Sequence, residues 1–278
     1  MALRADGKRV RKADPMYTVV PHIMDKRNDA MNMITVDVPV QPIQDYINNK
    51  RKEGVRLNHM SVLMAAYLRT VYEYPLLNNF IVNKKIYKHK EFKVAMVVLK
   101  NLVTQEETMS KVAFELDDDI FEVNRKMTEY VETNKKASTE NNTDKMIKFL
   151  LSIPGLLLVG VKLFKLLDRY GLLPKFITDL SPFHASVTLT NLASIRTNHI
   201  YHHIYNFGTT SVFIAMGKNR EVAKKKNGEI VFEKCMPLGV VMDERICSGI
   251  YFAAAFRKFS NYLENPALLE KKPEREED

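Results

Sequence analysis

Segments with the period of a β-strand alternate with segments that have the period of an α-helix along the chain, and this mixture limits the fold more than any other feature. Helical spacing of apolar residues appears in 43–52, 58–71, 120–134 and 249–263. Branched and aromatic residues typical of strands dominate 33–38, 80–87, 92–99, 109–114, 185–190 and 211–216. Asn227-Gly228 is typical of a hairpin turn. With no internal repeat, the pattern predicts an α/β fold (an α+β sandwich) in which helices flank a large mixed sheet.

The chain is long enough and apolar enough to form one large domain. It has 278 residues, of which 46% are hydrophobic, with only 10 Gly and 11 Pro. We therefore expect a single domain over residues 17–269. Residues 1–16 are expected to form a basic, disordered leader, and residues 270–278 a charged tail.

Residues 144–180 are predicted to form a helical insert in this domain. Two apolar helical pieces meet at Pro154-Gly155, and the second is amphipathic. Its basic side consists of Lys162, Lys165 and Arg169. The longest uncharged stretch, Phe149 to Val161, is well short of the roughly 20 residues that a membrane-spanning helix needs. The sequence therefore argues against an integral membrane span and leaves weak contact of 144–173 with a membrane surface as an alternative.

The net charge limits the kinds of partner that the protein can bind, and the cysteine content indicates its cellular compartment. A total of 42 Lys and Arg against 33 Asp and Glu gives a formal charge of +9. No basic stripe interleaved with aromatic residues accompanies this charge, so we expect no nucleic-acid partner. Cys235 and Cys247 do not make a disulfide framework, and the N-terminus lacks the apolar core of a signal peptide. Both observations favour a cytoplasmic protein.

Ordered motifs in the second half of the chain resemble one enzyme family. They are Val187-Thr188-Leu189-Thr190-Asn191, Ser211-Val212-Phe213-Ile214-Ala215 and Val241-Met242-Asp243-Glu244-Arg245-Ile246-Cys247-Ser248-Gly249, the last followed by an Ala-rich helix and Leu263-Glu264-Asn265-Pro266. This order is similar to the coenzyme A-dependent acyltransferase catalytic domain of 2-oxo-acid dehydrogenase complexes and of chloramphenicol acetyltransferase. The resemblance covers roughly 30–134 and 184–269 and implies a chloramphenicol acetyltransferase-like fold.

The resemblance implies a chemical role for three positions. In the family, the histidine of a His-x-x-x-Asp-Gly motif removes the proton from the thiol of coenzyme A, and a Ser or Thr hydroxyl helps to hold the oxyanion. Thr190 keeps the hydroxyl, whereas Glu244 stands at the histidine position and Ser248 at the aspartate position. These three are therefore the candidate catalytic residues, in a motif that is degenerate where its chemistry lies.

Other residues of the motifs are expected to support the site. Gly249 keeps the motif glycine, and Asn191 follows the candidate hydroxyl directly. Arg245 is a candidate for an ion pair with Glu244 or Asp243, although adjacent opposite charges are more often solvated. Cys247 is interpreted as a small apolar filler of a buried position and not as a nucleophile.

The histidines offer a substitute for the missing base. His199, His202 and His203 form a cluster that could supply a base near Thr190 or bind a metal ion. No Cys, Asp or Glu of that run completes a metal site, so a loop or strand edge is the favoured interpretation and no metal is expected. His59 and His184 are interpreted as capping or surface residues.

Two functions are consistent with these observations. The first is an acyltransferase that moves an acyl group from a coenzyme A thioester to an unknown acceptor, with weak or lost activity. The alternative is a pseudoenzyme, a catalytically inactive homologue that acts as a binding or scaffold protein. The resemblance implies a homotrimer with its site between subunits, and we expect no lipoyl domain before residue 30. The insert 144–180 is expected to cover the trimer surface or the mouth of the acyl channel.

Overall fold

The computed structural model describes residues 4–101, 106–135 and 142–273. Its centre is a seven-stranded mixed sheet in the order β2-β10-β8-β7-β5-β6, with β9 paired to β10. The strands are β2 (Met31–Pro39), β5 (Phe92–Asn101), β6 (Glu106–Phe114), β7 (Val187–Asn191), β8 (Val212–Met216), β9 (Arg220–Lys226) and β10 (Glu229–Asp243). Strand β7 runs parallel to β5 and β8, and the other pairs are antiparallel. The predicted large mixed sheet is thus confirmed.

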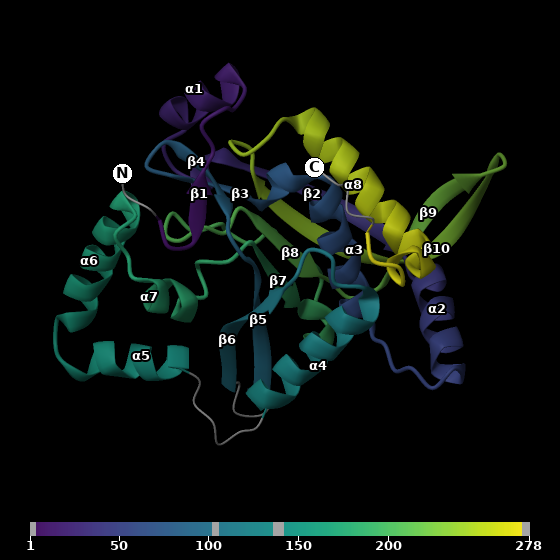
Figure 1. Ribbon diagram of the computed structural model, residues 1–278. Coiled ribbons are helices and arrows are strands. Elements are labelled where there is room, and N and C mark those ends of the chain that lie inside the picture. Colours follow the sequence, from purple (N-terminus) through teal and green to yellow (C-terminus); the bar gives the residue numbers. More distant parts are fainter. Residues whose placement is uncertain (1–3, 102–105, 136–141, 274–278) are drawn as a thin grey trace.

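One face of this sheet is covered by helices, as Figure 1 shows for α3, α4 and α8. The helices of this layer are α2 (Val40–Lys52), α3 (His59–Glu73), α4 (Ile120–Lys135) and α8 (Gly249–Glu264). Helix α3 is mostly apolar and is buried from Ser61 to Val71, because α2, α4 and α8 of the same chain surround it. Tyr67 meets the ring of Phe259 edge-on at 6.1 Å between centroids. Helix α3 contributes more buried apolar residues than any other described element.

The expected disorder of residues 1–16 is wrong for the part of this segment that the structure describes. Strand β1 (Gly7–Arg9) pairs with β4 (Lys85–His89), which pairs with β3 (Asn79–Val82) in a second, three-stranded sheet. Helix α1 (Pro15–Ile23) follows and is capped by Asp14. A side chain at Gly7 would place its Cβ 2.5 Å from the ring of Phe80, so only glycine fits there. The basic composition gave no sign of this strand, because the strand with which β1 pairs lies far away in the sequence.

Residues 144–180 are helical, as predicted, and the two apolar pieces separate at Gly155, whose φ is +80°. The helices are α5 (Asn142–Ser152), α6 (Leu156–Tyr170) and α7 (Lys175–Leu180). Gly160 lets α6 approach Leu150 of α5 closely. Four apolar residues of α6 at helical spacing form an exposed stripe: Val159, Leu163, Leu166 and Tyr170. Among the described residues, no helix is long and apolar enough to cross a membrane.

A buried histidine in the small sheet makes the fold sensitive to acid. Nδ1 of His89 lies 3.0 Å from the carbonyl oxygen of Asn78, and the ring packs 4.4 Å from that of Phe80. Burial lowers the pKa of His89 to about 4, from an ordinary value of 6.5.

We predict that the free energy of unfolding falls by about 2 kcal/mol between pH 7 and pH 5, because the unfolded chain binds a proton that folded His89 does not. This loss occurs as the pH falls from about 6.5 to about 4. In His89→Asn, whose amide can still donate to the Asn78 carbonyl, the loss should largely disappear. Urea unfolding at several pH values measures it, with exposed His22→Asn as the control. An unchanged pH dependence in His89→Asn would contradict the assignment.

Candidate functional site

The loop between β10 and α8 carries the degenerate motif and is held by a buried ion-pair cluster. Nε and Nη2 of Arg245 donate to the two carboxylate oxygens of Asp243 at 2.7 and 2.8 Å, and both residues are buried. Nη1 of Arg245 donates to the carbonyl oxygen of Met24 at 3.0 Å. The expected pairing of Arg245 with Asp243 is confirmed, and the alternative of solvated charges is wrong. Such a pair is stable in the core only because its hydrogen bonds are satisfied.

Glu244 sits beside this cluster but is not part of it. Its backbone N–H donates to the carbonyl oxygen of Ala30 at 2.9 Å. Its half-buried side chain makes no hydrogen bond or ion pair with any residue that the structure describes. The loop is therefore fixed through its backbone and neighbours, while the Glu244 carboxylate, at the histidine position, has no partner in the described part of the chain.

Ser248 and Gly249 begin helix α8. Oγ of Ser248 accepts a hydrogen bond from the N–H of Tyr251 at 3.1 Å, so this side chain is the helix N-cap. A Cβ at Gly249 would meet nothing within 4 Å. Within one chain, Ser248 thus caps α8. The described residues leave room for a larger side chain at position 249, so they do not require glycine there.

The candidate hydroxyl lies at the end of β7. Because side chains alternate along a strand, Thr188 and Thr190 point away from the helical layer, whereas Leu189 and Asn191 point towards it. Oδ1 of Asn191 accepts a hydrogen bond from the N–H of Ser194 at 3.1 Å and caps a short 3-10 turn. Asn191 is therefore a structural residue in this geometry, and Thr190 is the member of the strand that is free for chemistry.

Thr190 and Glu244 cannot meet within one chain. The strand register pairs Thr190 with Ala215 of β8, and Ala215 with Gly239 of β10. Glu244 follows Gly239 by five residues. At the usual rise of a strand, this offset separates Thr190 from Glu244 by roughly 17 Å along the sheet.

The three clustered histidines have separate surroundings. Nε2 of His199 lies 3.1 Å from Oγ1 of Thr35, and burial, followed by the charge of Arg220, lowers the pKa of His199. His202 stacks on Phe213 at 4.1 Å, while His203 is exposed. No metal group forms among the described residues of this run.

Both His199 and His202 lie over the sheet face of Thr190, since His202 stacks on Phe213, the β8 partner of Thr188. The segment of His199 crosses the sheet where two glycines leave room for its backbone. A Cβ at Gly217 would lie 2.2 Å from the backbone nitrogen of His199, and a Cβ at Gly239 would lie 2.3 Å from the backbone oxygen of Ile200. Thr35 and Thr190 belong to the same row of side chains across the four strands. His199 contacts Thr35, which is separated from Thr190 by β10 and β8, so neither of these two histidines touches Thr190.

A large cavity opens at the end of the sheet where β7 ends. Its volume is about 1090 Å³, in the size range of ligand sites, and Asn191 and Ser194 are among its lining residues. Five methionines line it: Met60, Met96, Met127, Met216 and Met236. Methionine side chains adapt to varied apolar groups. We refer to this space as the methionine-lined cavity.

The sequence interpretation of His59 missed its place in this cavity. His59 is the first residue of α3, it lines the methionine-lined cavity, and burial lowers its pKa. Its Nε2 is buried without a hydrogen-bond partner among the described residues. None of the lining residues comes from 144–180, so the described part of the insert does not form the walls of this cavity.

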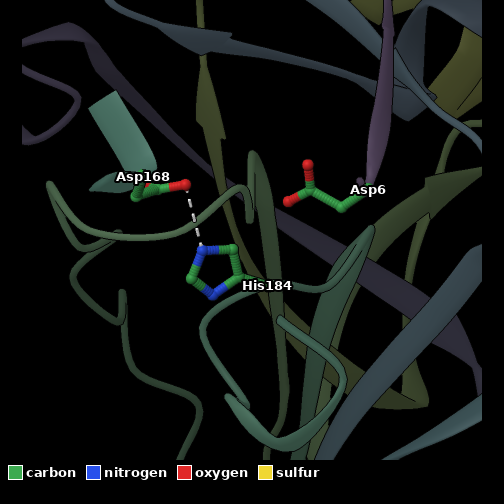
Figure 2. Close-up of side chains that lie close together, drawn as sticks. All are labelled: Asp6, Asp168 and His184. Atoms are coloured by element: carbon green, nitrogen blue, oxygen red, sulfur yellow. Dashed lines mark ion pairs between the residues drawn. The ribbon is translucent and has the colours of Figure 1, made fainter. Parts of the chain in front are cut away.

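His184 is buried and not a surface residue, which corrects its interpretation. Its Nε2 lies 3.3 Å from Oδ1 of Asp168, and Asp6 stands nearby, as Figure 2 shows. Oxygen and nitrogen atoms of the three side chains lie within 4.8 Å of one another, which is close enough to share a metal ion.

The guanidinium of Arg4 already occupies the space between these carboxylates. It donates to Asp6 at 2.8 Å and to Asp168 at 2.5 Å. Although burial opposes ionisation, the hydrogen bond and charge of His184, together with Arg4, lower the pKa of Asp168 to about 2. A metal cation here would face the positive charge of Arg4, so we interpret the group as an ion-pair network that fastens β1 and α6 to the loop before β7.

The sequence and the fold of this chain are similar to those of known proteins. Residues 183–270 match the family of 2-oxoacid dehydrogenases acyltransferases (catalytic domain). This range contains both Thr190 and the loop of Glu244. No curated protein sequence matches the chain.

Three solved structures show the similarity of fold. A probable dihydrolipoamide acetyltransferase from Listeria monocytogenes has 14% sequence identity and a TM-score of 0.58, over 93% of this chain and 94% of that chain. The dihydrolipoamide acetyltransferase of Azotobacter vinelandii has 10% identity and a TM-score of 0.61, over 94% of each chain. A chloramphenicol acetyltransferase has 11% identity and a TM-score of 0.54, over 92% of this chain and 99% of that chain.

We predict that neither cysteine reacts with a thiol reagent in the native protein. Both side chains are buried, and burial raises the pKa of the Cys247 thiol, so little thiolate is available. Labelling with an aromatic disulfide should be slow in buffer and should reach both thiols in denaturant. Cys247→Ser, which leaves Cys235, should then lose one of the two equivalents. Rapid labelling of native Cys247 would contradict its interpretation as a structural filler.

Proposed function

We propose that this chain, whose fold is that of the chloramphenicol acetyltransferase-like superfamily and whose residues 183–270 match the acyltransferase catalytic domain, binds coenzyme A thioesters and transfers acyl groups weakly. The observation that carries the proposal is the position of Thr190, at the end of β7 and within the matched range. The methionine-lined cavity opens at the same end of that strand but on the opposite, helical side of the sheet, and Thr190 is not among its lining residues, so the cavity adds nothing to the argument from Thr190.

The proposed reaction is acyl transfer through a tetrahedral intermediate. A base takes the proton from the acceptor, and the acceptor attacks the thioester carbonyl to form the intermediate. The intermediate then collapses, the carbon–sulfur bond breaks, and the coenzyme A thiolate leaves and takes the proton back from the base. The hydroxyl of Thr190 would donate a hydrogen bond to the oxyanion. Glu244 would act as the base. A glutamic acid usually has a pKa near 4.3, against about 8.5 for a thiol, so a carboxylate is a poor base towards thiols and the reaction should be slow.

The separation of Thr190 and Glu244 supports a site between subunits. A neighbouring copy could bring its Glu244 to Thr190, which one chain cannot do. The apolar surface of α3 is no argument for assembly, because the chain covers this helix itself. A different surface supports assembly: the β9–β10 hairpin projects beyond the sheet (Figure 1), and Ile230 and Phe232 on it are 73% and 71% exposed. We therefore propose a homotrimer.

A catalytically inactive binding or scaffold protein is the second candidate. It is favoured by the replacement of two motif side chains by Glu244 and Ser248, the second of which serves as a helix cap. In that case the cavity would bind an acyl thioester without turnover. Two buried, unpaired cysteines are compatible with a reducing cytoplasm, which we propose as the compartment.

We predict little or no acetyl transfer by the wild-type protein, and an increase of roughly tenfold or more in Glu244→His/Ser248→Asp. The variant restores an imidazole base, and aspartate is as good an N-cap as serine, so α8 should keep its start. Thr190→Ala in this background should abolish the gain, whereas the matched control Thr190→Ser should keep most of it. Release of free coenzyme A from acetyl-coenzyme A, followed with a thiol reagent, measures the rates.

Strong wild-type turnover that survives Glu244→Ala would refute Glu244 as the base. His199 and His202, over the same sheet face as Thr190, would then be the next residues to test. Binding of acetyl-coenzyme A by calorimetry, without release of coenzyme A in any variant, would favour the scaffold function.

We predict that light scattering at micromolar concentration gives three times the mass of one chain. Ile230→Ser/Phe232→Ser should shift the protein towards monomers, because the hairpin would lose its apolar contacts with the neighbouring copy. Ile23→Ser, on exposed α1, is the control for the loss of a surface apolar group and should remain trimeric. A wild-type monomer would exclude both the trimer and an intersubunit site.

A further inference from the structure

A second cavity, remote from the methionine-lined one, is strongly basic. Its volume is about 570 Å³, and α6, the β3–β4 turn, the segment before β2 and the loop before β8 enclose it. Six cationic side chains line it: Lys26, Arg27, Lys84, Lys165, Arg169 and Arg245. Two carboxylates, Asp25 and Asp168, stand against them. We refer to this space as the basic cavity.

The two carboxylates are already engaged by other cations. Asp25 pairs with Lys84 at 2.8 Å, and Asp168 pairs with Arg4 from outside the cavity. Lys26 and Lys165 have no ion-pair partner among the described residues. Nε of Arg169 donates only to the side-chain amide oxygen of Asn83, at 3.3 Å. The mouth of the basic cavity therefore presents cations whose charge is not neutralised.

The floor of the cavity contains a further excess of positive charge. Arg27 is 4% exposed, and its Nη atoms donate to the carbonyl oxygens of Ile81, Tyr205 and Gly208. Its Nε makes no hydrogen bond among the described residues and lies 3.4 Å from Oδ2 of Asp243. That carboxylate is already bound bidentately by Arg245. One buried carboxylate thus serves two buried guanidinium groups.

The excess of buried positive charge indicates that a ligand of the basic cavity would be an anion. Burial lowers the pKa of Arg27, and the charge of Asp243 opposes this effect only in part. A buried cation that lacks a full counter-charge destabilises the fold, and an anion in the cavity would remove that cost. Guanidinium and ammonium groups that converge from several segments match an anion with several oxygen atoms, which a phosphate group provides.

We propose that the basic cavity binds a phosphorylated ligand through its phosphate group. The volume is that of a small-molecule site. The phosphate could belong to a soluble phosphate ester or to the headgroup of an anionic phospholipid, since α6 also carries the exposed apolar stripe from Val159 to Tyr170. The proposal does not require acyl transfer, since it involves neither Thr190 nor Glu244 itself, although Arg245 of the Glu244 loop lines the basic cavity.

The chain offers a matched pair of variants for the test. Lys162 and Lys165 lie on the same exposed side of α6, and only Lys165 is among the residues that line the basic cavity. Lys165→Gln removes one charge from the cavity, whereas Lys162→Gln removes the same charge from the helix beside it. Both side chains are exposed, so both variants should fold, which their melting temperatures would establish.

The soluble probe is inorganic pyrophosphate, titrated by calorimetry at low salt. We expect binding to the wild type, about tenfold weaker binding to Lys165→Gln, and nearly unchanged binding to Lys162→Gln, since a hydrogen bond to a charged group contributes about a factor of ten. Lys26→Gln/Lys165→Gln should bind at least as weakly as Lys165→Gln.

Vesicles distinguish the two sources of phosphate. Flotation with phosphatidylcholine vesicles that contain phosphatidylglycerol, dependent on Lys165 and not on Lys162, would support a lipid headgroup. Pyrophosphate binding with the same dependence and no flotation would support a soluble phosphate ester. The proposal is overturned if neither probe binds, or if both probes respond equally to Lys162→Gln and Lys165→Gln, because general surface charge would then explain the result.

Discussion

The carboxylate of Asp243 is the group on which the rest of this structure depends. It lies at the end of β10, fully buried, and two guanidinium groups, those of Arg27 and Arg245, converge on it. Arg245 also holds the carbonyl of Met24, so the cluster ties the segment between α1 and β2 to the start of the motif loop. Removal of one partner would leave a buried charge uncompensated, which is costly. The loop that carries Glu244 and the floor of the basic cavity are both consequences of this arrangement.

The sheet register decides what the motif residues can do. Thr190 lies in β7 and Glu244 directly follows β10 of the same sheet, yet the pairing of β7, β8 and β10 puts them far apart along it. The chemistry of acyl transfer needs a hydroxyl and a base within hydrogen-bond reach of the same carbonyl. In the proposed reaction, Glu244 of a neighbouring copy would therefore have to come to Thr190, because one chain holds the two residues apart.

The helical insert changes the surface of the fold more than its core. Helices α5, α6 and α7 add an exposed apolar stripe and a basic side beside the ends of α1 and β3, while the methionine-lined cavity is formed by other elements. Arg4 fastens this insert through Asp168, so the N-terminal strand and the insert stabilise each other. Helix α6 lines the basic cavity and not the methionine-lined one, and the two cavities differ in their lining: cationic side chains in one and methionines in the other.

Local sequence determined the repeating elements and the motif. Periods of two and 3.6 residues placed most of the strands and helices, and Pro154-Gly155 marked the break between α5 and α6. Ordered motifs from Val187 to Pro266 gave the resemblance to the acyltransferase catalytic domain, whose family model matches residues 183–270. Tertiary structure alone decided which charged residues are buried. Arg4 pairs with Asp168, 164 positions away, and Arg27 with Asp243, and charged side chains in a local sequence give no sign of such partners. The unpartnered nitrogen of His59 and the separation of Thr190 from Glu244 likewise depend on distant strands and helices. The periodicity of apolar residues shows which face of a single helix or strand is buried. Ion pairs and cavities form between elements that are distant in the sequence, so this periodicity does not predict them.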